Sequence, residues 1–181
     1  MSSIFKRIIF VMAVVTTLLF LSLLIAAWYL GAFASVDLNT TNKPVRFFVA
    51  TSGTGPYKET LEQLKTLQKY ISDHSLPAEI PAVFLYDNPL NTPLPQVATR
   101  AVYLLADSVQ IEQPYRLFRL PSRKIVSAAI AANPAIAPYK TYPAIREWCE
   151  RYQLRTDTRG IIIEFYKDDG RVVVEFPVLE Q

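Results

Sequence analysis

A single glutamate within an apolar run is the first candidate for chemistry. Glu164 lies in the stretch from Ile161 to Tyr166, and strand alternation places its side chain on one face with Ile162 and Tyr166. Burying an unpaired carboxylate costs several kcal/mol, so such an acid needs solvent, an internal arginine or a ligand. If a ligand is the reason, Glu164 would attract a cation and the ring of Tyr166 would offer it a π face.

The sequence also contains a duplication. The step Gly55-Pro56-Tyr57-Lys58 recurs as Ala137-Pro138-Tyr139-Lys140, and each copy leads to a strand-like stretch that joins an aromatic residue to an acid, Phe84–Asp87 and then Phe165–Asp168. Two equivalent halves leave a cleft along their shared axis, and small ligands bind in clefts. A duplicated ligand-binding module is therefore predicted.

Three further tyrosines are candidates for the walls of that cleft. Tyr57 and Tyr139 occupy the two equivalent turns, and Tyr86 is an aromatic residue of the first strand-like stretch. Together with Glu164 and Tyr166 they form the predicted ligand-binding set. Each tyrosine has a structural alternative, since a phenol ring also packs well at helix starts and on strands.

The elements that must position these residues repeat as well. Residues 45–110 show a compact apolar strand, an amphipathic helix after Lys58 and two further strands, whereas residues 115–181 show a strand near 124–131, a second helix and a hairpin closed by Asp169-Gly170. The second helix carries its apolar residues on one face: Tyr142, Ile145, Trp148, Cys149 and Tyr152. We predict an α+β fold in which two β-α-β-β modules form a curved antiparallel sheet with the helices on one face.

The N-terminal segment has the composition of a membrane span. Residues 8–30 carry no charge, Lys6 and Arg7 precede them, and Trp28 and Tyr29 lie at their far end. We expect a cytoplasmic N-terminus at 1–7, a signal anchor at 8–30, a linker at 31–44 and an extracytoplasmic domain at 45–181. A cleaved signal peptide with the cleavage site Ala32-Phe33-Ala34 is the alternative, but the apolar run is longer than a usual signal core.

Composition argues against several classes of site. The formal net charge is +3, and without Lys6 and Arg7 the rest of the chain is nearly neutral, so nucleic-acid binding is not indicated. Cys149 and His74 are the only residues of their types, which argues against an intrachain disulfide, a zinc site and a Ser-His-Asp triad. We expect Cys149 to be a buried, inert thiol, and we expect no metal and no cofactor.

Taken together, these motifs resemble the GyrI-like small-molecule-binding family, which includes the effector-binding domains of AraC-type and MerR-type regulators. The resemblance spans about residues 45–179 and rests on Gly55-Pro56-Tyr57, the stretch from Ile80 to Pro89, Ala137-Pro138-Tyr139, and Ile163-Glu164-Phe165-Tyr166 before a final strand. It implies two modules framing a cleft, with a glutamate, matched by Glu164, that contacts cationic ligands. Ala137 departs from the family glycine, and no DNA-binding helical pair is present, so a transcription factor is not expected.

A closer similarity is to membrane-anchored members of that family. It rests on Tyr86-Asp87-Asn88-Pro89, Leu120-Pro121-Ser122 and Glu164-Phe165-Tyr166. The leading hypothesis is a membrane-tethered module that binds an amphipathic or cationic small molecule. Some GyrI-like proteins resemble hydrolases of electrophilic compounds, so the alternatives are an enzyme with Glu164 as general base and Tyr139 as its helper, or an adaptor without a ligand.

Overall fold

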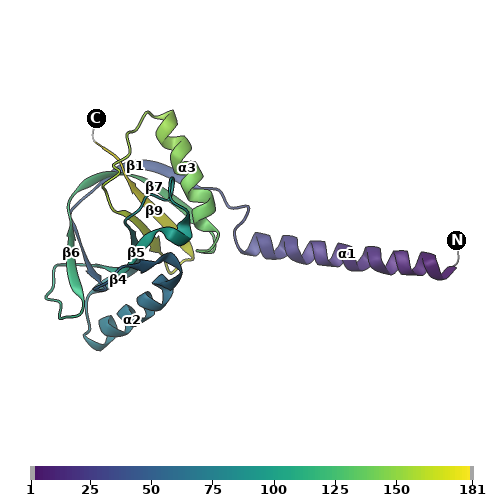
Figure 1. Cartoon of the computed structure of the whole chain (residues 1–181), viewed down its shortest axis with the longest axis horizontal. Helices are drawn as coiled ribbons and strands as arrows, with labels where there is room; N and C mark the ends of the chain where they lie inside the picture. The colour runs from purple at the N-terminus through teal and green to yellow at the C-terminus, as the bar shows by residue number, and fades with distance from the viewer. Residues whose placement is uncertain (1–2, 180–181) are drawn as a thin grey trace.

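The structure, a computed structural model, describes residues 3–179. Residues 1–2 of the expected cytoplasmic segment and 180–181 of the expected domain lie outside the described residues. Helix α1 (Ser3–Tyr29) projects away from a domain formed by the rest of the chain (Figure 1). Its stretch Arg7–Tyr29 is 23 residues long, apolar enough to cross a membrane, and 0% buried, which separates it from the core helix of a soluble domain.

One antiparallel sheet of nine strands organises the domain, in the order β1-β7-β9-β8-β4-β5-β2-β6, with β3 paired to β5. The strands are β1 (Asp37–Lys43), β2 (Arg46–Ala50), β3 (Gly55–Pro56), β4 (Ala78–Leu85), β5 (Ala98–Leu105), β6 (Arg116–Leu120), β7 (Arg123–Ala131), β8 (Ile162–Tyr166) and β9 (Arg171–Pro177). The helical elements of the domain are η1 (Tyr57–Glu59), α2 (Thr60–Asp73), η2 (Leu94–Gln96) and α3 (Ala137–Arg151). The predicted α+β fold is confirmed.

The sheet order shows how the duplication is built. Strands β2, β4 and β5 flank α2 along the chain, strands β7, β8 and β9 flank α3, and the two sets meet where β4 pairs with β8. Each set is preceded by one more strand, and these two strands are exchanged: β1 pairs with β7, and β6 pairs with β2. Each half of the chain is therefore a β-β-α-β-β unit, and the first strand of each unit pairs with a strand of the other half.

Part of the expected linker is one of these leading strands. Within 31–44, Asp37–Lys43 forms β1 and pairs along its whole length with β7. Its polar sequence gives no hydrophobic alternation, so the stretch resembles a linker until its partner is known. The backbone of β7 supplies that partner, and Trp148 of α3 donates a hydrogen bond from Nε1 to Thr40 Oγ1 at 3.0 Å. The ordered domain thus begins before residue 45.

Both helices lie on the same face of the sheet and end in the same way. Leu67 and Ile71 of α2 pack on β2 and β5, and Ile145 of α3 packs in the cluster that includes β7 and β9. After α2, Ser75 adopts a φ of 49° and Leu76 N donates to Ile71 O at 3.1 Å; after α3, Gln153 adopts 53° and Leu154 N donates to Cys149 O at 2.9 Å. These are Schellman-type ends, which satisfy the last helix carbonyls.

The opposite face of the sheet is curled and filled with its own side chains. Phe48, Phe84 and Phe165 form an aromatic core there, with ring centroids 4.9 Å apart for Phe48 and Phe84 and 6.3 Å apart for Phe48 and Phe165. The alternation of side chains along each strand therefore buries both faces of the sheet, one under the helices and one inside the curl. The inner face of the curl is therefore occupied by the chain's own side chains.

Candidate functional site

Glu164 is fully buried in the centre of the sheet, on the face that the helices cover. It lies opposite Val83 of β4 on one side and Val174 of β9 on the other, at the junction of the two halves. Its exposed fraction is 0%. The prediction that alternation groups Glu164 with Tyr166 is confirmed, because the two side chains are in contact.

Three tyrosine hydroxyls donate hydrogen bonds to this carboxylate. Tyr57 donates to Oε2 at 2.7 Å, Tyr166 donates to Oε2 at 3.0 Å, and Tyr142 donates to Oε1 at 2.5 Å. The hydroxyl oxygens of Tyr57 and Tyr166 are 3.5 Å apart. We call these four residues the tyrosine–glutamate cluster.

The three tyrosines of the cluster come from different parts of the fold. Tyr57 opens η1 after Pro56, Tyr142 lies on the buried face of α3, and Tyr166 ends β8 two residues after Glu164. The two halves of the duplication thus each contribute, since Tyr57 belongs to the first and the others to the second. The site sits where the starts of the two helical segments come together above the sheet.

Burial dominates the electrostatics of the cluster. It raises the pKa of the Glu164 carboxyl, while the three tyrosine hydrogen bonds act in the opposite direction and lower it. Burial and the nearby Glu164 raise the pKa of Tyr57, Tyr142 and Tyr166, so all three phenols stay protonated and donate. Every partner of the acid is therefore a neutral donor, and no ion pair within 4.0 Å joins Glu164 to any lysine, arginine or histidine of residues 3–179.

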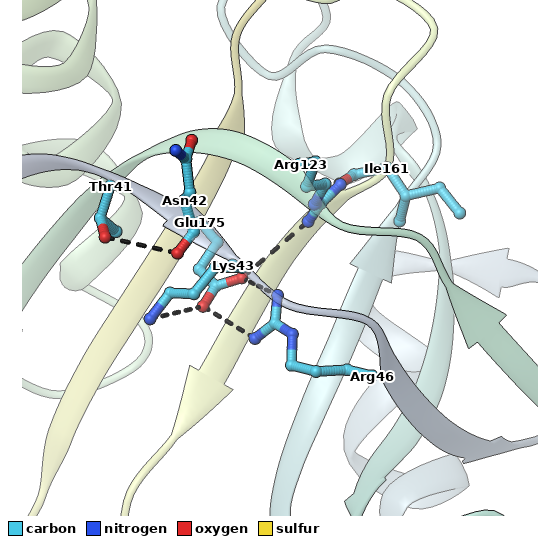
Figure 2. A network of polar contacts seen from close by, with 7 residues as sticks. All are labelled: Thr41, Asn42, Lys43, Arg46, Arg123, Ile161 and Glu175. Atoms are coloured by element: carbon cyan, nitrogen blue, oxygen red, sulfur yellow. Dashed lines mark hydrogen bonds and ion pairs between the residues drawn. The ribbon is translucent and has the colours of Figure 1, made fainter.

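A second buried glutamate shows what a structural acid looks like in this fold. Glu175 of β9 lies on the inner face of the curl, surrounded by Lys43, Arg46 and Arg123 (Figure 2). Arg46 binds both carboxylate oxygens, with Nη1 donating to Oε1 at 2.9 Å, and Lys43 Nζ is 3.7 Å from Oε1. Glu175 thus has cationic partners from its own chain, whereas Glu164 has none among the residues that the structure describes.

Two hollows reach the tyrosine–glutamate cluster from the helix side. One, of about 360 Å³, lies between the start of α2 and the turn at 133–135, and Tyr57 and Tyr166 line it. The other, of about 350 Å³, lies between α3 and the proline-rich loop at 89–95, and Tyr142 lines it. We call the first the α2 hollow and the second the α3 hollow. Each hollow is thus lined by at least one tyrosine whose hydroxyl donates a hydrogen bond to Glu164.

The structure brings three of the five predicted site residues together and leaves two apart. Tyr57, Glu164 and Tyr166 are in the cluster. Tyr139 is 72% exposed on the first turn of α3, where it lines the rim of the α3 hollow. Tyr86 directly follows β4 and points to the same face of the sheet as Phe84, which is the face opposite to Val83 and Glu164. Its ring lies 5.6 Å from the Arg100 guanidinium.

The residue that sequence reasoning did not assign to the site is Tyr142. It was predicted on the apolar face of the second helix with Ile145 and Cys149, and it is buried there. The same stripe that packs the helix on the sheet aims the Tyr142 hydroxyl at the sheet centre. The apolar stripe of the helix is therefore the sequence signal for Tyr142, but this stripe alone predicts only packing.

The expectation of a buried thiol at Cys149 is confirmed. Cys149 is buried, and burial raises the pKa of its thiol, which makes it a poor nucleophile. Within residues 3–179 no three His, Cys, Asp or Glu side chains are grouped so that they could hold a metal ion.

Comparison of the structure with solved structures identifies the same fold in bacterial proteins. The C-terminal domain of EcmrR aligns with a TM-score of 0.65 and 11% identity, over 81% of this chain and 99% of that one. SAV2435 bound to tetraphenylphosphonium aligns with a TM-score of 0.57 and 12% identity, over 79% and 94%. A hydrolase from Listeria innocua aligns with a TM-score of 0.56 and 14% identity, over 79% and 92%.

These likenesses concern the fold, which is the GyrI-like fold expected from the sequence motifs. The chain spans 58% of the EcmrR chain found in a complex with DNA, so it matches only part of that regulator. No protein-family model and no curated protein matches the sequence.

Proposed function

We propose that this chain is a membrane-tethered binding module for an amphipathic, cationic small molecule, with Glu164 as the anionic centre of its site. The observation that carries the proposal is the contrast between the two buried glutamates. Glu175 is neutralised by its own chain, whereas the contacts of Glu164 are three uncharged hydroxyls. A buried carboxylate with donors but without a counter-charge is suited to a cation that arrives from outside.

The surroundings of the acid support the same class of ligand. The α2 and α3 hollows have volumes within the range of small-molecule sites, and their linings are largely apolar and aromatic. Aromatic faces stabilise a cation by roughly 0.5 to 2 kcal/mol each. Among the solved structures of this fold, SAV2435 is bound to tetraphenylphosphonium, a bulky lipophilic cation, which makes that ion a rational probe.

The proposed location follows from α1. Its apolar side chains are exposed along the helix, and Lys6 and Arg7 lie in α1 just before its uncharged stretch, so by the positive-inside rule the domain lies outside the cytoplasm. Lys140 Nζ donates hydrogen bonds to the carbonyls of Ala32 and Ala34, so the domain contacts the residues that follow α1, which supports an uncleaved anchor. The partners we propose are a small molecule and a bilayer, and not a nucleic acid.

The hydrolase alternative has less support from the geometry. It assigns Tyr139 as the helper of Glu164, and that phenol is exposed on α3, whereas Tyr57, Tyr142 and Tyr166 make the contacts. The adaptor alternative leaves a buried acid without a purpose.

Tetraphenylphosphonium titrated into the full chain by calorimetry tests the proposal. Glu164→Gln removes the charge at nearly constant shape and is expected to weaken binding by about 1.5 to 3 kcal/mol, which is about ten- to a hundredfold in Kd. The matched control is Glu62→Gln, since the Glu62 side chain is 77% exposed on α2 and paired only with Lys65. The control should bind as the natural chain does. Equal affinity of the Glu164→Gln form would remove Glu164 from the site.

A further inference from the structure

The end of α1 is seated on the domain. Gly31, with a φ of 80°, is buried so closely that a Cβ added there would lie 2.6 Å from Ala131 O and from Ala132 Cα. The amide of Asn133 donates a hydrogen bond to Leu30 O at 3.0 Å. The residues just after the helix therefore fit against the turn between β7 and α3.

The first turn of α3 strengthens this junction. Lys140 Nζ donates to Ala32 O at 2.8 Å and also to Ala34 O, across more than a hundred residues of sequence. Strand β1 begins soon afterwards at Asp37, so the segment that joins α1 to the sheet is held against the domain. The orientation of the domain relative to α1 is thus fixed by contacts, and Figure 1 shows α1 leaving the domain near the start of α3.

The turn that receives α1 is also a wall of the site. Asn133 and Pro134 line the α2 hollow together with Tyr57 and Tyr166. The same two residues also line another hollow, distinct from the α3 hollow, together with Tyr29 and Leu30 at the end of α1. One turn therefore separates the mouth of the Glu164 site from the end of the apolar helix. Aromatic residues at such a helix end lie at the interface between lipid and water.

The surface around this mouth is apolar. Leu61, which lines the α2 hollow, is 61% exposed, and Phe33, between α1 and β1, is also exposed. Lys58 is exposed at the same rim, where a cation faces anionic lipid headgroups favourably. An exposed apolar rim beside a membrane helix is suited to contact with the bilayer surface.

From this placement we propose that the Glu164 site takes its ligand from the membrane surface through the α2 hollow, so that its ligands are cations that partition into the headgroup layer. The inference rests on the proposed function and adds the route of entry and the partitioning class of ligand. A ligand concentrated in the bilayer reaches the mouth by diffusion along the surface. A water-soluble cation of the same charge lacks that advantage.

Two measurements on the full chain in lipid nanodiscs test the route. The first places a fluorophore on Leu61→Cys and measures its quenching by lipids that carry a spin label on the headgroup. The matched control is Leu117→Cys on β6, which lies at the end of the domain opposite to α1 in Figure 1. Cys149 is the only natural cysteine and is buried, so the label goes to the introduced one. Strong quenching at 61 and weak quenching at 117 are expected.

The second measurement uses a variant with twelve Gly and Ser residues inserted between Tyr29 and Leu30. The insertion keeps the contacts of Leu30, Gly31 and Ala32 with the domain but releases the domain from the bilayer. Quenching at Leu61→Cys should fall to the level at 117. Association of tetraphenylphosphonium, measured by stopped flow, should slow at least threefold, while its equilibrium affinity for the site stays within a factor of two.

The outcomes distinguish a failure of the proposed entry route from a failure of the proposed function. Binding that depends on Glu164 but shows equal rates with and without the insertion, or equal quenching at 61 and 117, overturns the route and leaves the function standing. Binding that does not depend on Glu164 overturns the proposed function, and the route with it. Glu164-dependent binding that slows on insertion supports both.

Discussion

At the scale of single residues, the candidate site depends on one position at which the two halves of the duplication carry different residues. If the stretch at Phe84 is matched with that at Phe165, Val83 is the counterpart of Glu164, and the two lie directly opposite each other where the halves meet. A second glutamate at 83 would place two carboxylates side by side in a buried position, where like charges repel. The first half therefore supplies a neutral wall and the second half supplies the charge.

The raised pKa of Glu164 gives a pH dependence of stability with a definite sign. An unfolded glutamate titrates near about 4.3. Because folding raises the pKa, the folded state holds the proton more tightly, so the contribution of Glu164 to the free energy of unfolding is greatest below about pH 4.3 and falls as the pH rises through the folded pKa. Above that pKa the loss stays constant.

Glu164→Gln should lack this loss. The difference in free energy of unfolding between the Gln form and the natural chain is expected to shift in favour of the Gln form as the pH rises from 4 to 8, as measured by urea unfolding at several pH values. Curves that run parallel across this range would contradict burial as the dominant influence on the Glu164 carboxyl.

At the scale of elements, the equivalent ends of α2 and α3 place non-glycine residues in the left-handed region, which costs an L-residue roughly 1 to 2 kcal/mol. Ser75, with a φ of 49°, is exposed after α2. Ser75→Gly is expected to raise the free energy of unfolding by about 0.5 to 1 kcal/mol, after the greater freedom of glycine in the unfolded chain is counted. Ser72→Gly inside α2 is the control and should lower it by about 0.5 to 1 kcal/mol. Thermal unfolding measures both, and equal signs would contradict the interpretation.

The elements also show what sequence patterns can and cannot provide. Amphipathic spacing predicted both helices, and apolar runs bounded by turns predicted β4, β8 and β9, because burial on one face leaves a periodic trace. The polar strand β1 leaves no such trace, since its order comes from pairing with β7 far along the chain. The same limit applies to Tyr139, because the Pro-Tyr-Lys step opens a 3-10 turn at Tyr57 but continues as an α-helix at Tyr139, which turns the second phenol outward.

At the scale of the whole molecule, the two halves are joined a second time inside the curl. Arg46 begins β2 and Arg123 begins β7, and each arginine comes three residues after the end of the preceding strand, β1 or β6. Each also follows a turn that contains a proline, Lys43-Pro44-Val45 in the first half and Leu120-Pro121-Ser122 in the second. Both arginines reach Glu175 of β9. Strands β5, β4 and β8 lie between β2 and β9 in the sheet order, so this contact requires the curl.

The two buried glutamates should therefore differ in their response to the same substitution. Glu175→Gln leaves Arg46 and Arg123 without their anion, and losing one partner of a buried pair costs about 3 to 5 kcal/mol. The loss of stability is expected near the lower limit of this range, because Lys43 is partly exposed and water solvates its charge when the glutamate is removed. Glu164→Gln, which strands no cation, should not lower stability by this amount near neutral pH. Chemical unfolding of both variants at pH 7 measures the contrast.

A compensating variant tests whether the charge itself is responsible. In Arg46→Met combined with Glu175→Gln, one buried cation is removed together with the acid, so the double variant should recover part of the stability that Glu175→Gln loses. If the double variant is instead the less stable by the sum of the two single effects, Arg46 and Glu175 act independently, and the curl is held by its aromatic core rather than by this pair. Recovery would mean that charge pairing between Arg46 and Glu175 closes the inner face of the curl.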